Sequence, residues 1–234
     1  MTDYSKNFWH PMLHPNEAKA REPIHIVSGD GEYITDDKGH KLLDGVAGLW
    51  CVNVGHNRPE MKKAIMKQLD ELEYFQLFDG ISHPRATELA EKLVNMTEPE
   101  NMKRAFFTSG GSDSVETALK LARQFHIING EPERKKFISL KNGYHGVHFG
   151  GASVNGINVF RRNYEPLLGG VIHLDTPWLY RNPWGCENPE QLAQLCIDQL
   201  EQEILHQMPD TIAAFIAEPI LGAGGVIVPP EAYW

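Results

Sequence analysis

The chain has 234 residues, of which 41% are hydrophobic, enough to bury a core of one large domain or two small ones. Its formal net charge is −9 and it has no run of five or more Lys and Arg residues, which excludes a typical nucleic-acid-binding surface. Its three cysteines are an odd number without metal-ligand spacing, which argues against a disulfide framework and a zinc cluster.

The N-terminal residues and the apolar runs of the sequence indicate where in the cell the protein is expected. Residues 1–15 lack a basic segment followed by an apolar one, and no uninterrupted apolar run approaches roughly 18 residues. We therefore expect a soluble, cytoplasmic protein that works on small molecules, with no nucleic-acid partner, no membrane partner and no metal.

The N-terminal part combines strand-like and helical patterns. Residues 24–27, 31–35 and 42–43 are β-branched, aromatic or aliphatic and are separated by turn residues, which predicts a small β-meander. Apolar residues then recur every three to four positions from Pro59 to Leu72 and from Ala86 to Leu93, which predicts two amphipathic helices.

The remainder alternates short apolar runs with helical spacing. Strands are predicted at 105–108, 137–140, 171–174 and 212–217, because each run is short and bounded by polar or turn residues. A helix is predicted after the glycines near 110, and a second one begins at Asn188 as N-cap with Pro189 at its first position. This alternation predicts an α/β fold with a mostly parallel sheet, preceded by a small N-terminal α+β segment.

Gly110, Gly111 and Ser112 stand between the strand predicted at 105–108 and the following helix. Glycines at such a turn let backbone N–H groups approach an anion, and the helix start adds unpaired donors and its dipole. The alternative is an ordinary glycine turn, since glycine is the default residue where φ must be positive. The segment is neither a Walker loop nor a dinucleotide-binding G-x-G-x-x-G.

Three further segments carry candidate functional residues. Tyr144 and His145 follow the strand predicted at 137–140, and their alternative is a turn with a packed tyrosine. Glu218 ends the strand predicted at 212–217, where open α/β sheets keep their sites; its alternative is an exposed loop carboxylate. Trp50, in the segment 44–56, is either a pocket wall or a core tryptophan.

These four segments together resemble, in the same order, those of class III aminotransferases that depend on pyridoxal phosphate, of the omega-amino-acid and amine type. The resemblance implies fold type I, with 1–60 contributing to the small domain and substrate pocket and 61–234 forming the N-terminal part of the large cofactor domain. It also implies transfer of an amino group from an amine or omega-amino acid to pyruvate or another 2-oxo acid, in a homodimer.

The resemblance assigns roles to individual residues. Gly110, Gly111 and Ser112 match the phosphate cup, although Gly110 stands where the family usually has serine, so one hydroxyl contact is replaced by backbone. Tyr144 would stack on the cofactor ring, with His145 as a structural neighbour and Glu218 beside the cofactor. Trp50 would line the substrate pocket, and Phe78 would also reach it, as would Trp9 and Phe75.

The lysine that forms the Schiff base with the cofactor in this family has no counterpart in these 234 residues. In the family it lies well beyond the segment that matches Ala217, Glu218 and Pro219, whereas the last lysine here is Lys141. We therefore expect a fragment that is inactive alone and lacks the C-terminal half of the large domain. Two alternatives remain open: a non-catalytic module that binds a phosphorylated ligand or a partner, and an aminomutase of the same superfamily.

Overall fold

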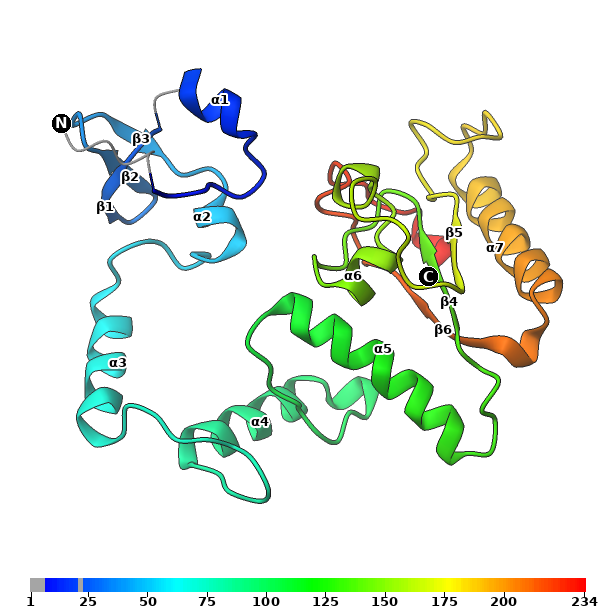
Figure 1. Ribbon diagram of the computed structural model, residues 1–234, viewed down its shortest axis with the longest axis horizontal. Helices are drawn as coiled ribbons and strands as arrows, with labels where there is room; N and C mark the ends of the chain where they lie inside the picture. Colours follow the sequence, from blue (N-terminus) through cyan, green and yellow to red (C-terminus); the bar gives the residue numbers. More distant parts are fainter. Residues whose placement is uncertain (1–6, 21–22) are drawn as a thin grey trace. The chain divides into compact units, whose positions relative to one another are not determined.

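The chain folds as two units, Met1–Met96 and Thr97–Trp234, in a computed structural model that describes residues 7–20 and 23–234 (Figure 1). Within those ranges, no helix is long and apolar enough to cross a membrane. The same ranges contain no group of three or more His, Cys, Asp and Glu side chains placed to hold a metal ion.

An antiparallel meander forms the centre of the first unit and confirms the predicted one. Strands β1 (Ile26–Asp30), β2 (Tyr33–Asp36) and β3 (Lys41–Leu43) pair in the order β1-β2-β3. The turn between β2 and β3 is closed by Asp36, whose carboxylate accepts the backbone N–H groups of Lys38 and His40 at 3.0 and 2.7 Å. Such side-chain to backbone bonds are the usual means by which aspartate stabilises a turn.

Four helices accompany the meander in the described part of this unit. The two long ones confirm the predicted pair, and the first of these has Pro59 at its start, where the missing N–H costs nothing. Their apolar side chains, including Ile65 and Leu89, are exposed. The helices are α1 (Pro15–Ala20), α2 (Ala47–Trp50), α3 (Pro59–Glu71) and α4 (Pro84–Met96).

The second unit is built on a parallel sheet of three strands, which confirms the predicted strands at 137–140, 171–174 and 212–217. The strands are β4 (Lys136–Leu140), β5 (Val171–Leu174) and β6 (Ile212–Ile216), in the order β5-β4-β6. Because all three run the same way, their carboxyl ends and the loops after them share one edge of the sheet. That edge is where open α/β sheets place ligands.

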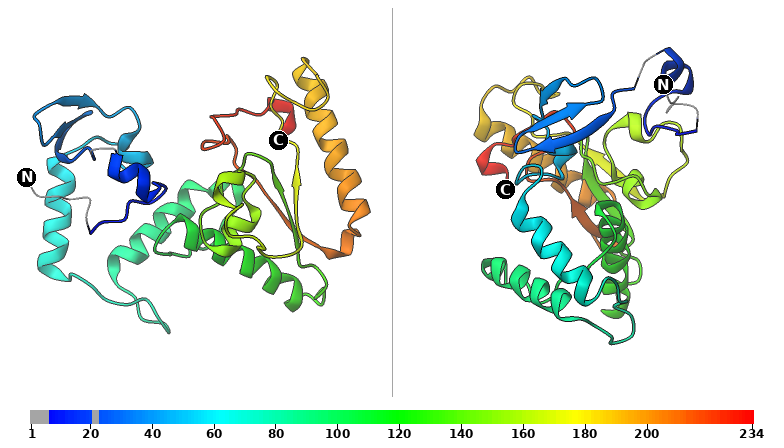
Figure 2. Two further views of the ribbon diagram at one scale, coloured as in Figure 1. Left: turned by 45° about the horizontal axis from the view of Figure 1, so that its top comes forward. Right: turned by 90° about the vertical axis from the view of Figure 1, so that its left-hand side faces the viewer.

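Helices cover both faces of this sheet, as Figures 1 and 2 show. On one face, Leu119 of α5 packs with Phe137 of β4 and Val154 of α6. On the other, Ile138 and Leu140 pack against α7. The helices are α5 (Gly111–Ile128), α6 (Phe149–Val154) and α7 (Pro189–His206), with 3-10 turns at Glu98–Glu100, Asn158–Phe160, Pro209–Thr211 and Glu231–Tyr233.

The start of α7 agrees with the predicted cap. The Asn188 side chain accepts the backbone N–H of Gln191 at 2.8 Å, and Pro189 occupies the first turn. This bond satisfies one of the donors that a helix start leaves unpaired, so the sequence determines the beginning of this helix locally.

The strand predicted at 105–108 is wrong. The segment pairs with no strand of residues 7–20 and 23–234, and Phe106 is exposed. Its apolar composition suits a strand, but a strand exists only where a neighbour supplies hydrogen bonds to its backbone. The helix predicted after it is present as α5.

Candidate functional site

The first turn of α5 carries the predicted anion-binding residues. Gly110 precedes the helix in an extended conformation and supplies no capping side chain, so the first N–H groups of α5 are not capped by it. A Cβ added at Gly111 would meet no atom within 4 Å, and one at Gly110 only Asp113 Oδ2, at 4.0 Å. No side chain at positions 110 and 111 therefore stands between these donors and a ligand, and the positive end of the helix dipole lies behind them.

Glycine is usually found at a turn because φ must be positive there, but this is not the reason for the two glycines at this turn. Neither Gly110 nor Gly111 has a positive φ, so backbone strain does not require glycine at either position. What the two glycines provide is the absence of side chains in front of the N–H groups. This is the property that close approach of an anion needs.

The loop after β4, which carries Tyr144, contacts this turn through Gly146 and Val147. Gly146, with φ of +103°, lies so close to α5 that an added Cβ would be 2.9 Å from both Cα and Oγ of Ser112. Ser112 Oγ also accepts the backbone N–H of Val147 at 3.1 Å. Because the hydroxyl accepts this bond, its own hydrogen remains available to donate to a ligand.

Tyr144 itself is half-buried and makes an edge-to-face contact with Phe160, with ring centroids 5.1 Å apart and planes at 61°. This contact restricts the orientation of the Tyr144 ring, since aromatic pairs favour edge-to-face and offset geometries. The structure therefore places an oriented aromatic ring on the loop that contacts the turn of Ser112.

Glu218 connects this loop to the end of β6. One carboxylate oxygen accepts the backbone N–H of Tyr144 at 2.7 Å, and the other accepts that of Gly222 at 3.0 Å. Glu218 is half-buried, so it is not a free surface carboxylate. It joins the loops that follow two neighbouring parallel strands, β4 and β6.

His145 is buried, with 6% of its surface exposed, and its ring Nε2 has no hydrogen-bond partner among the described residues. Burial lowers the pKa of His145, and the negative charge of Glu218 opposes this shift only in part. The imidazole is therefore neutral at neutral pH. It packs close to Gly143, where a Cβ would lie 3.1 Å from Nε2.

Two residues that the sequence analysis missed hold these loops in place. Asn155 is fully buried; its side chain accepts the N–H of His145 and donates to the carbonyl of Gly146 at 2.8 Å. Glu116 of α5 accepts the N–H of Gly150 at 2.9 Å. The sequence carries no signal for either role, because only the fold brings Asn155 and Glu116 to the backbone groups that they satisfy.

The other predicted site residues belong to the unit Met1–Met96. Trp50 and Phe78 are 67% and 78% exposed, and Trp9 and Phe75 are exposed as well. Trp50 is therefore not buried among the residues that the structure describes. Whether these four side chains line a substrate pocket stays a prediction.

Lys141, the last lysine of the sequence, is engaged in an ion pair. Lys141 donates to Asp175 Oδ1 at 2.6 Å. Burial raises the pKa of Asp175, but hydrogen bonds from Lys141 and Gln199 outweigh this and hold the pKa below its usual value. Lys141 is thus a paired ammonium group, which is a poor nucleophile.

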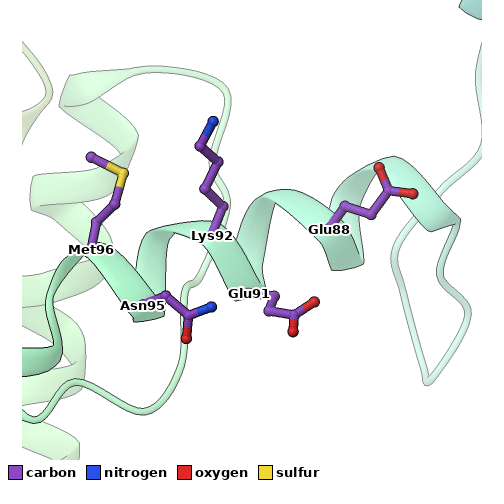
Figure 3. A pocket seen from close by; sticks show the side chains of 5 residues that line it. All are labelled: Glu88, Glu91, Lys92, Asn95 and Met96. Atoms are coloured by element: carbon purple, nitrogen blue, oxygen red, sulfur yellow. The ribbon is translucent and has the colours of Figure 1, made fainter.

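A surface hollow lies along α4 (Figure 3). Its lining side chains all come from this one helix and include none of the predicted site residues. They are Glu88, Glu91, Lys92, Asn95 and Met96. With a single wall and no converging groups, this hollow has no feature of a ligand site.

Comparison with known proteins places the chain in a family. The aminotransferase class-III family matches residues 15–234. A putrescine–pyruvate aminotransferase of Pseudomonas aeruginosa is 40% identical over 89% of this chain and 45% of its own length. An omega-aminotransferase of Caulobacter vibrioides is 40% identical over 100% of this chain and 53% of its own length. The chain thus spans about half the length of these relatives.

Comparison with solved structures leads to the same family. An amine transaminase from an uncultivated Pseudomonas species, in its PLP-bound form, has a TM-score of 0.95 and 58% identity over 98% of this chain and 52% of its own. The omega transaminase of Pseudomonas jessenii in complex with PMP has a TM-score of 0.95 and 39% identity over 98% and 51%. The α/β fold is therefore fold type I, and the chain belongs to the class-III aminotransferase family.

Proposed function

We propose that the protein to which these residues belong transfers an amino group from an amine or omega-amino acid to pyruvate or another 2-oxo acid, with pyridoxal phosphate as cofactor. The observation that carries the proposal is the contact between the turn Gly110–Ser112 and the loop after β4 that contains Tyr144, called here the Tyr144 loop. An anion site and an oriented aromatic ring on two segments that touch each other fit a planar ligand that bears a phosphate group.

The residues present fit this cofactor in a specific way. Uncapped N–H groups at the start of α5 would hold the phosphate, and the Ser112 hydroxyl has a hydrogen left to donate. The Tyr144 ring would lie against the pyridine ring, and Glu218 fixes the backbone of Tyr144. When bound, pyridoxal phosphate supplies an electron sink for bond breaking at the amine carbon.

The catalytic lysine is proposed to lie outside these 234 residues. Lys141 is ion-paired with Asp175, and no lysine follows it in the sequence. We therefore expect that these residues bind cofactor and that turnover requires the whole protein. A homodimer and a cytoplasmic location are further parts of the proposal.

The substrate class rests on Trp50 and Phe78 as apolar walls of the pocket, since a rigid apolar surface favours amines without a nearby carboxylate. The names of the two relatives, putrescine–pyruvate aminotransferase and omega-aminotransferase, support this class. So does a solved omega transaminase variant in which a tryptophan is replaced by glycine, engineered for the synthesis of bulky amines.

The test is an assay of the whole protein with pyridoxal phosphate, a panel of primary amines and omega-amino acids, and pyruvate. We expect alanine to form, and we expect Tyr144→Ala to bind the cofactor more weakly than Tyr144→Phe, which keeps the ring. Whole protein that binds pyridoxal phosphate but forms no amino acid from pyruvate or any other 2-oxo acid would overturn the proposal.

A further inference from the structure

Helix α2 is a left-handed turn, and it carries Trp50. Ala47, Gly48, Leu49 and Trp50 have φ values of 49°, 58°, 63° and 71°. Three of these four residues are not glycine, and side chains disfavour this region because Cβ crowds the following carbonyl. Consecutive residues of this kind persist only where the surroundings hold them, and such strain gathers at functional sites.

The carboxylate of Asp44 holds this turn. Oδ2 accepts the backbone N–H of Gly48 at 2.7 Å, and the backbone carbonyl of Asp44 accepts the N–H of Ala47 at 3.4 Å. The turn also has a backbone hydrogen bond of its own, in which the N–H of Trp50 donates to the carbonyl of Val46 at 2.9 Å. Asp44 is therefore bonded to the first two residues of the turn, and Trp50 is its last residue.

His56, for its part, holds the Asp44 side chain in place. His56 Nε2 lies 2.8 Å from Asp44 Oδ2, and the Asp44 side chain is 6% exposed. The hydrogen bond from His56 is the largest cause that lowers the pKa of Asp44, so the carboxylate stays charged. His56 is anchored to the meander through paired backbone bonds with Gly31, at 2.7 and 3.2 Å.

The meander is shaped to receive this histidine. A Cβ added at Gly29 of β1 would lie 2.7 Å from the His56 ring, so only glycine leaves room for it. The chain of contacts runs from β1 through His56 and Asp44 to the turn of Trp50. The strands of the meander pair with one another through their backbones, and the side chains of His56 and Asp44 take no part in that pairing.

We propose that Asp44 and His56 are positioning residues that hold Trp50 in its left-handed turn and thereby set which amines the enzyme accepts. This rests on the proposed function, in which Trp50 lines the substrate pocket. Trp50 would touch the amine, and Asp44 and His56 act through it.

The test uses the whole protein and three variants. Asp44→Ala removes the acceptor, Asp44→Asn removes the charge but keeps one oxygen that can bond both Gly48 and His56, as Oδ2 does, and Asp36→Ala is the matched control. Asp36 also pairs with a histidine, His40 at 2.9 Å, and accepts backbone N–H groups in the same meander, but it has no bond to the turn of Trp50.

Two measurements are made on each variant: amide hydrogen exchange of residues 46–52, and the ratio of kcat/KM for a bulky and a small amine. In Asp44→Ala we expect both to change by about tenfold or more, the effect of losing a hydrogen bond to a charged group. We expect Asp44→Asn to restore most of both values and Asp36→Ala to leave both unchanged.

Two results would overturn the proposal. Exchange of residues 46–52 in Asp44→Ala that equals wild type would show that the carboxylate does not hold the turn. Faster exchange with an unchanged amine ratio would show that the turn does not set selectivity. If the wild-type protein transaminates no amine, the proposed function fails, and the exchange data alone decide whether Asp44 holds the turn.

Discussion

Gly146→Ala tests whether the Tyr144 loop and the turn of Ser112 pack as tightly as the structure shows. Gly146 has a φ of +103°, and its new Cβ would lie 2.9 Å from Ser112 Cα and Oγ. A backbone conformation that only glycine adopts readily costs about 1–3 kcal/mol when a side chain is added. Overpacking against the rigid first turn of α5 adds about 1–3 kcal/mol.

We therefore expect the free energy of unfolding to fall by about 2–6 kcal/mol, measured by urea denaturation of the whole protein. Cofactor affinity should fall as well, because the loop pushes Ser112 from its place. The control is Gly169→Ala, where an added Cβ meets no atom within 4 Å and φ is not positive. Its stability should be unchanged or rise by up to about 1 kcal/mol. If the two variants were equally stable, the close contact between loop and turn would be refuted.

Three further changes probe the same loops. Asn155→Ala leaves the N–H of His145 and the carbonyl of Gly146 unpaired in the interior, so thermal unfolding should show a loss of about 2–4 kcal/mol; an unchanged Tm would contradict this. Glu218→Gln leaves one acceptor oxygen for two N–H groups, so titration with pyridoxal phosphate should show about tenfold weaker binding, and equal affinity would contradict it. His145 has a lowered pKa in the folded state, so the unfolded chain takes up the proton first as pH falls below about 6.5. The free energy of unfolding should therefore fall between about pH 7 and pH 5, and His145→Asn should reduce this slope.

The sequence predicted the elements of the fold well, because their signals are local. The strands β4, β5 and β6 are short apolar runs between turn residues, and the start of α7 follows from Asn188 and Pro189. The segment 105–108 has the same local signal and is not a strand. Composition reports the preference of a segment, but whether a neighbouring strand exists depends on the rest of the fold.

The site depended on contacts that sequence spacing does not reveal. Tyr144 and Glu218 are joined by a hydrogen bond across 74 positions, and Ser112 and Val147 across 35. The resemblance to a known family supplied those residues, whereas Asn155, which holds the same loop, was missed. A single buried asparagine has no pattern in the sequence, because only the folded chain shows which N–H and carbonyl groups it satisfies.

The left-handed turn of Trp50 could not be predicted either. Ala47, Leu49 and Trp50 are unremarkable in a right-handed helix, and the sequence analysis singled out Trp50 only by resemblance. The turn is bonded to the Asp44 carboxylate, and this carboxylate is bonded to His56, 12 residues further along the chain. Both belong to the arrangement of the meander and not to any local pattern.

The central claim is that Gly110–Ser112 and Tyr144 bind the two ends of one cofactor. The most direct test is a crystal structure of the whole protein soaked with pyridoxal phosphate. We expect the phosphate to lie within hydrogen-bonding distance of the first N–H groups of α5 and of the Ser112 hydroxyl, with the pyridine ring against the ring of Tyr144. A phosphate bound elsewhere, or a cofactor ring that does not contact Tyr144, would contradict it.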